Sequence, residues 1–175
     1  MIRVQREDFD IGPELDALTR DNPGIGGLCS FVGLVRDIHP DARTPGGAGE
    51  SDAGDGGDEA GGKVSAMTLE HYPGMTEKML ERIDAEAHRR WPLEASLVIH
   101  RYGRMEPGER IVLVATASAH RQAAFDSCQF LIDWLKTKAP FWKLEETAQG
   151  GRWVDARDSD DEAAQRWGRD DWAAE

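Results

Sequence analysis

Five basic side chains that could bind anions lie within one 26-residue segment of the chain. His120 and Arg121 stand where a predicted strand gives way to a predicted helix, and the free N–H groups at a helix start favour an anion. Lys136 and Lys138 lie at the predicted end of that helix, and Lys143 follows a proline that forces a change of direction. In a chain with 33 acidic and 21 basic residues, this grouping predicts a site for an anionic ligand.

The same residues also have ordinary structural interpretations. Lysines in the last turn of a helix commonly complement its dipole. A single histidine such as His120 is more often structural than catalytic, and Phe141 and Trp142 fit a hydrophobic core better than a stacking surface. Spacing alone therefore leaves the anion site and the structural interpretation both open.

Other kinds of site are disfavoured by the sequence. The five histidines show no metal-ligand spacing, and two cysteines make neither a zinc site nor a disulfide framework. Cys29 and Cys128 fall in apolar segments, which predicts structural thiols. The GxGxxG, GxxxxGK[ST] and GxSxG motifs are absent. A net charge of −12 and a pI near 4.8 argue against a nucleic-acid binder.

No stretch approaches the ~20 apolar residues of a membrane span, and the first residues lack the apolar core of a secretory signal. The protein is therefore expected in the cytoplasm.

Hydrophobic periodicity predicts an α/β (α+β) domain with a mixed sheet. The apolar run over 110–118 predicts a strand buried on both faces. The acidic segment 41–63 is predicted to be a long hairpin connection between the strands that flank it. The predicted strands are 2–5, 26–36, 64–72, 95–102, 110–118, 141–147 and 152–154; the helices are 13–19, 73–90, 120–138 and 159–167. The helix over 120–138 is predicted to bury Phe125, Cys128, Leu131, Ile132 and Leu135.

Two segments hold most of the negative charge. Residues 41–63 contain six acidic residues, two basic residues and eight glycines, without an aliphatic residue larger than alanine. Such a composition predicts a disordered loop, which could be a neutral solvated loop, an adaptation to salt or a steering element for a partner. Residues 155–175 contain eight acidic residues and three arginines, and are predicted to be an acidic C-terminal tail. Residues 1–154 are then one domain, which carries a net charge of only −3 outside the acidic loop 41–63.

Five ordered blocks make the chain resemble the large, catalytic subunit of molybdopterin synthase. The blocks are SFVGLVR at 30–36, LEHYPGM at 69–75, SAHR at 118–121, LKTKAPFWK at 135–143 and RWV at 152–154. The resemblance covers nearly the whole chain except the acidic loop and the end of the tail. It implies an α/β hammerhead-like fold with a mixed sheet and an additional antiparallel β element.

The resemblance also implies a reaction. Enzymes of this family are sulfurtransferases that convert cyclic pyranopterin monophosphate (precursor Z) to molybdopterin, in molybdenum cofactor biosynthesis. Two dithiolene sulfurs arrive as a C-terminal thiocarboxylate on a small ubiquitin-like subunit. A homodimer of the large subunit within a heterotetramer is implied, without a cofactor or metal.

By the same resemblance, Lys136 and Lys143 are the expected catalytic residues. Lys136 is assigned to the thiocarboxylate, and Lys143 to the substrate or the developing oxyanion. The implied substrate-binding residues are Leu34, Val35, Arg36, His120, Arg121, Leu144 and Glu145. Leu34 departs from the family pattern, because relatives often carry a basic residue there. The family assembles its site across the dimer, so these residues need not converge within one chain.

A non-catalytic binding module for a ubiquitin-like partner or a phosphorylated ligand is the alternative function. The basic cluster alone does not separate this alternative from an enzyme.

Overall fold

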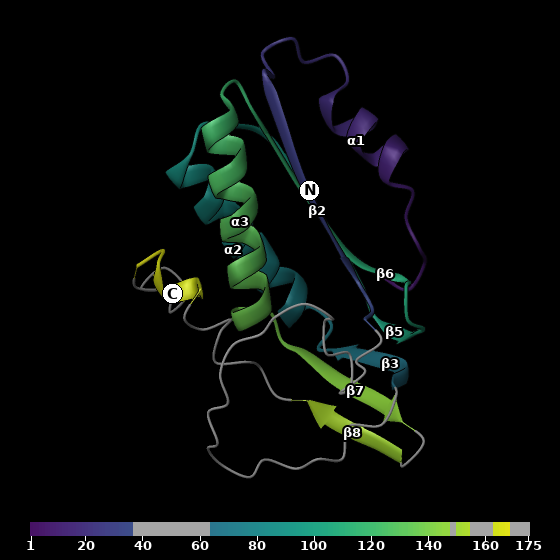
Figure 1. Ribbon diagram of the computed structural model, residues 1–175. Coiled ribbons are helices and arrows are strands. Elements are labelled where there is room, and N and C mark those ends of the chain that lie inside the picture. Colours follow the sequence, from purple (N-terminus) through teal and green to yellow (C-terminus); the bar gives the residue numbers. More distant parts are fainter. Residues whose placement is uncertain (37–63, 148–149, 155–162, 169–175) are drawn as a thin grey trace, which may run out of the picture.

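The fold has two four-stranded sheets and three helices within the residues that the structure describes (Figure 1). The computed structural model describes residues 1–36, 64–147, 150–154 and 163–168. The elements are β1 (Ile2–Gln5), α1 (Ile11–Thr19), β2 (Gly27–Leu34), β3 (Val64–His71), α2 (Met75–Arg90), β4 (Leu93–Arg101), β5 (Gly103–Met105), β6 (Arg110–Ser118), α3 (Arg121–Lys138), β7 (Phe141–Thr147) and β8 (Gly150–Val154). The predicted disordered loop 41–63 lies outside the described residues.

The first sheet has the strand order β1-β4-β6-β2 and is mixed, because β1 pairs parallel to β4 while the other pairs are antiparallel. Helices α2 and α3 cover one face and α1 covers the other (Figure 1). Along β6, Val112 and Val114 pack under α2 and α3, whereas Leu113 and Ala115 pack under α1. The prediction that this strand is buried on both faces is confirmed.

The second sheet has the order β5-β3-β7-β8 and is antiparallel throughout. It lies beyond the end of α3, and β7 continues directly from that helix (Figure 1). The combination of a mixed sheet with an additional antiparallel element confirms the predicted fold class.

The predicted hairpin around the acidic segment is wrong. Strand β2 pairs with β6 in the first sheet, whereas β3 lies between β5 and β7 in the second sheet. Sequential strands usually pair when their connection is short, but here residues 37–63 separate them in the sequence. A long connection removes the constraint, and each strand pairs where its side chains pack.

Two smaller expectations also differ from the structure. Strand β5 was not predicted, because three residues are too few to show a period. Phe125 was predicted to be buried, but its side chain is 55% exposed. The buried stripe of α3 runs instead through Ala124, Cys128 and Leu131, and Phe125 lies about 100° away from Ala124 around the helix.

The C-terminal segment 163–168 packs against α2 and α3. Trp167 contacts the rings of Trp91 and Phe130, and its indole Nε1 donates to Asp133 Oδ2 at 2.8 Å. Arg90 donates to the carbonyl oxygen of Trp167 at 2.7 Å. Of the helix predicted over 159–167, residues 163–165 form one helical turn and residues 159–162 lie outside the described part. This segment therefore braces the half of α3 that carries Lys136.

His100 lies where the two sheets meet. Its ring stacks on Phe141 of β7 with centroids 3.8 Å apart, and its Nδ1 lies 2.9 Å from the carbonyl oxygen of Arg101. Burial lowers the pKa of His100 from 6.5 to about 4, the hydrogen bond to Arg101 opposes this shift, and nearby His71 adds to it. The neutral imidazole is therefore the form that the fold accommodates.

We expect stability to fall as the pH drops from 6.5 towards 4, because the unfolded chain then binds a proton at His100 that the folded chain does not. The difference between the two pKa values corresponds to roughly 3 kcal/mol. Denaturant unfolding across this pH range should show a shallower dependence for His100→Gln, which keeps an N–H donor. His88→Gln, at an exposed position on α2, is the control, and equal slopes for all three proteins would contradict the assignment.

Candidate functional site

The antiparallel pairing of β2 and β6 determines which candidate residues meet. Gly27 pairs with Ser118 at one end, and Leu34 pairs with Arg110 at the other. Helix α3 starts beyond Ser118 and packs back along β6, so its last turn returns towards the Arg110 end. The end of β2 and the end of α3, which carries Lys136, therefore lie at the same end of the first sheet (Figure 1).

Lys143 joins this end of the fold from β7. It pairs with Leu69 of β3, and Glu145 pairs with Met67, so these four side chains share one face of the second sheet. Leu69 and Met67 pack against Val35 in a small core cluster. Lys143 thus lies on the face of the second sheet that meets residues 34–36.

Lys143 is paired with a buried carboxylate. Its Nζ lies 2.7 Å from Glu145 Oε1, and Glu145 is only 5% exposed. Because a charge-assisted hydrogen bond at this distance fixes the place of the side-chain nitrogen, Glu145 orients the lysine.

The three residues at the end of β2 differ in what they offer a ligand. Leu34 is 53% exposed, whereas Val35 is buried and its backbone bonds to the turn over 106–109. Arg36 is exposed and follows directly. Leu144 belongs to the opposite face of β7 from Lys143, because side chains alternate along a strand. Arg36 therefore supplies the charge at this position.

His120 and Arg121 lie at the opposite end of the first sheet. Both are exposed, with His120 at the N-cap and Arg121 as the first residue of α3. Their backbone turn is closely packed, since a Cβ at Gly26 would lie 2.3 Å from the carbonyl oxygen of Ala119. Fifteen residues separate Arg121 from Lys136, a helical rise of about 22 Å. The chain does not bring these two groups together by itself.

Three of the predicted site cations therefore lie at this end of the fold, Lys136 in α3, Lys143 in β7 and Arg36 just after β2. Such an arrangement can hold anionic groups and stabilise negative charge that develops during a reaction. Trp142, which the sequence favoured as a core residue, is 50% exposed beside Lys143, whereas Phe141 is packed on His100. The exposed indole is a feature that the sequence did not single out.

The two cysteines do not offer a nucleophile. Cys128 is 3% exposed in the core beneath α3, and burial raises the pKa of its thiol, with neighbouring Cys29 adding to the shift. Cys29 is partly buried against the same core cluster. Both are free thiols, and their packing agrees with the structural role predicted for them.

Other kinds of site can be considered within residues 1–36, 64–147, 150–154 and 163–168. Within them, no three His, Cys, Asp or Glu side chains are grouped so that they could hold a metal ion. In the same part of the chain, no helix has the length and apolar character needed to cross a membrane.

Comparisons with known proteins place the chain among related sequences. The family model described as "MoaE protein" matches residues 4–138. The chain is 55% identical over 166 residues to the molybdopterin synthase catalytic subunit of Pseudomonas aeruginosa, covering 95% of this chain and 97% of that one. It is 46% identical over 166 residues to the protein of the same name from Vibrio cholerae, with coverage of 95% and 97%. The solved structure of a molybdopterin biosynthesis MoaE protein from Burkholderia ambifaria matches with a TM-score of 0.74 and 50% identity, covering 97% of this chain and 98% of that one.

Proposed function

Because the chain belongs to the MoaE protein family, we propose that it is the catalytic subunit of a sulfurtransferase that makes molybdopterin. The substrate is cyclic pyranopterin monophosphate, and the enzyme inserts the two dithiolene sulfurs. Relatives about half identical to this chain over nearly its full length bear the name of that subunit.

The proposal is supported by the placement of Arg36, Lys136 and Lys143 at the same end of the fold. The reaction brings together a substrate that bears a phosphate and a thiocarboxylate that bears a negative charge. Two anions repel each other by about 4 kcal/mol at 4 Å near a protein surface unless cations lie between them. Positioned cations offset this repulsion and stabilise the transition state.

We assign the two lysines different roles. Lys136, exposed in the last turn of α3, meets the thiocarboxylate and stabilises charge or moves a proton as sulfur attacks. Lys143, held by Glu145 at 2.7 Å, meets the substrate or the developing oxyanion. Arg36 contacts the phosphate. Val35 shapes the part of the site next to Arg36 through its backbone, while Leu34 and Leu144 lie beside the site.

We propose that a second copy of the chain supplies His120 and Arg121. Their separation of about 22 Å from Lys136 along α3 prevents a joint role within one chain. A symmetric dimer makes two equivalent composite sites, each with the lysines of one copy and the His120–Arg121 pair of the other. This dimer forms the centre of a heterotetramer with two small subunits.

The sulfur source is a small ubiquitin-like partner, whose C-terminal thiocarboxylate enters the site. We propose that the chain needs no cofactor or metal, since the partner delivers the sulfur and the lysines stabilise the negative charge of the reacting groups. A cytoplasmic location is proposed because Cys29 and Cys128 are both free thiols, as is usual for proteins in a reducing compartment.

Turnover by purified components tests this function. The chain is incubated with thiocarboxylated small partner and cyclic pyranopterin monophosphate, and sulfur in the product is counted by mass spectrometry. We expect a product with two added sulfurs, and a partner whose C-terminus returns as a carboxylate. Saturable binding of both ligands without a sulfur-containing product would favour the non-catalytic binding module.

A further inference from the structure

A buried arginine outside the cationic site anchors the turn that holds the end of β2. Arg101, the last residue of β4, is 7% exposed. Its guanidinium donates to the carbonyl oxygens of Arg6 at 3.1 Å and Arg110 at 2.8 Å. It also donates from both terminal nitrogens to Glu109 Oε1, at 3.3 and 3.2 Å. One side chain thus ties the end of β4 to Arg6 and to residues 109–110.

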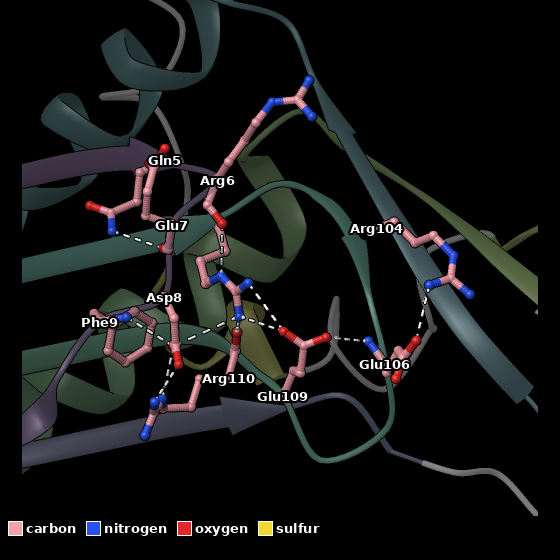
Figure 2. A network of polar contacts seen from close by, with 10 residues as sticks. Gln5, Arg6, Glu7, Asp8, Phe9, Arg104, Glu106, Glu109 and Arg110 are labelled. Carbon is pink, nitrogen blue, oxygen red and sulfur yellow. Dashed lines mark hydrogen bonds and ion pairs between the residues drawn. The ribbon is translucent and has the colours of Figure 1, made fainter.

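The turn over 106–109 is closed by Glu109 itself. The carboxylate of Glu109 accepts from the backbone N–H of Glu106 at 2.7 Å, and the N–H of Glu109 donates to the Glu106 carbonyl oxygen at 3.0 Å. Gly108 has a φ of +90°, which favours glycine at this position. Figure 2 shows Glu109 between Glu106 and Arg110. The conformation of the turn therefore depends on the carboxylate that Arg101 holds.

The turn over 106–109 in turn holds the backbone of Val35 through two hydrogen bonds. The N–H of Val35 donates to the Glu109 carbonyl oxygen at 2.9 Å, and the Val35 carbonyl oxygen accepts from the N–H of Gly108 at 2.8 Å. The side chain of Val35 is buried. Arg36 follows Val35 directly, so the direction in which its side chain leaves the fold is set by this turn.

A second arginine links the turn to the strand of Lys143. Arg104 of β5 donates to Glu106 on the turn and to Glu146 on β7, both at 3.2 Å. Thr68 of β3 also donates to Glu146, at 3.3 Å. The network therefore links the 106–109 turn to β3 and β7 of the second sheet.

We propose that Arg101 is a positioning residue for substrate binding, acting through Glu109 and the 106–109 turn on Arg36. The inference rests on the proposed contact between Arg36 and the substrate phosphate. A guanidinium offers a rigid fork of donors that an ammonium cannot reproduce. Replacing Arg101 by lysine therefore keeps the positive charge but loses the geometry that sets the turn.

The test measures equilibrium binding of cyclic pyranopterin monophosphate together with turnover. In Arg101→Lys we expect the Kd and the KM to rise about tenfold, a change that corresponds to the loss of about one charge-assisted hydrogen bond. The kcat should change less than about threefold, because a phosphate contact is equally strong in the ground and transition states. Arg89→Lys is the matched control, at an exposed arginine bound to Glu86 on α2, and should leave all three constants unchanged.

A double-mutant cycle separates positioning from general damage. If Arg101 acts through Arg36, then Arg101→Lys should add little to the Kd in an Arg36→Ala background. Glu109→Gln can replace Arg101→Lys in the same double-mutant cycle. The side chain of Glu109 is partly exposed, so this variant should fold. It should raise the Kd in the same direction.

Additive effects of Arg101→Lys and Arg36→Ala, or a fall in kcat with unchanged Kd, would overturn the inference. Absence of turnover in the wild-type chain would instead overturn the proposed function. The double-mutant cycle measured on the Kd for the pterin phosphate would still decide the role of Arg101. A wild-type chain that does not bind the pterin phosphate would overturn both.

Discussion

Lys136→Ala should lower molybdopterin formation by at least about a hundredfold while the chain still binds its small partner. Removing one group that stabilises transition-state charge typically costs 10²–10³ in kcat. Lys136 is exposed in the last turn of α3, and surface substitutions change stability by only about 0.5 kcal/mol. The measurement is single-turnover sulfur transfer from thiocarboxylated partner, with partner affinity determined separately by titration.

Lys78→Ala provides a matched control for Lys136→Ala. Lys78 is also an exposed helical lysine, but it lies on α2. Its replacement should leave both turnover and partner affinity unchanged. Near wild-type turnover of Lys136→Ala would remove this lysine from the chemistry, and a loss that parallels lost partner affinity would make it a docking residue.

Lys143→Ala should produce two effects, a loss of turnover of at least about a hundredfold and a loss of stability of about 1–2 kcal/mol. The second effect arises because Glu145, buried at 5% exposure, loses the ammonium that lies 2.7 Å away. The lysine side chain is 32% exposed, so water screens part of the interaction. Chemical denaturation and the turnover assay measure the two effects independently.

The double variant Lys143→Ala, Glu145→Gln separates the two effects of Lys143. Neutralising Glu145 removes the buried negative charge that Lys143 contacts, so stability should return towards that of the wild type. Turnover should stay low, because the cation that meets the substrate is still absent. Recovery of turnover in the double variant would show that Lys143 acts only by neutralising Glu145.

Much of the local structure is predictable because it depends on neighbours in sequence. The apolar run that forms β6 and the proline that ends α3 act within a few residues. The partner of β2 is different, since it is chosen by packing against a strand more than 75 residues away. Short β5 has no periodic signal, and its strand conformation is seen only in its pairing with β3.

The site shows the same division. The blocks around Lys136 and Lys143 are visible in the sequence. The direction of β2 and α3 explains why Arg36 lies at the same end of the fold as these lysines, whereas His120 lies at the opposite end. The importance of Arg101 is also invisible in the sequence, where an arginine after an apolar strand resembles a surface residue. Only its burial and its contacts with distant backbone show otherwise.

Mixing two inactive variants tests the composite site most directly. Lys136→Ala and His120→Ala are each expected to be inactive alone, and subunits are exchanged by co-refolding equal amounts. In a symmetric dimer, each mixed pair then contains one site with both groups intact, and half of the dimers are mixed. Turnover should recover to about one quarter of the wild-type value. Recovery no greater than the activity of either parent variant, with mixed dimers present, would contradict a site built from two chains.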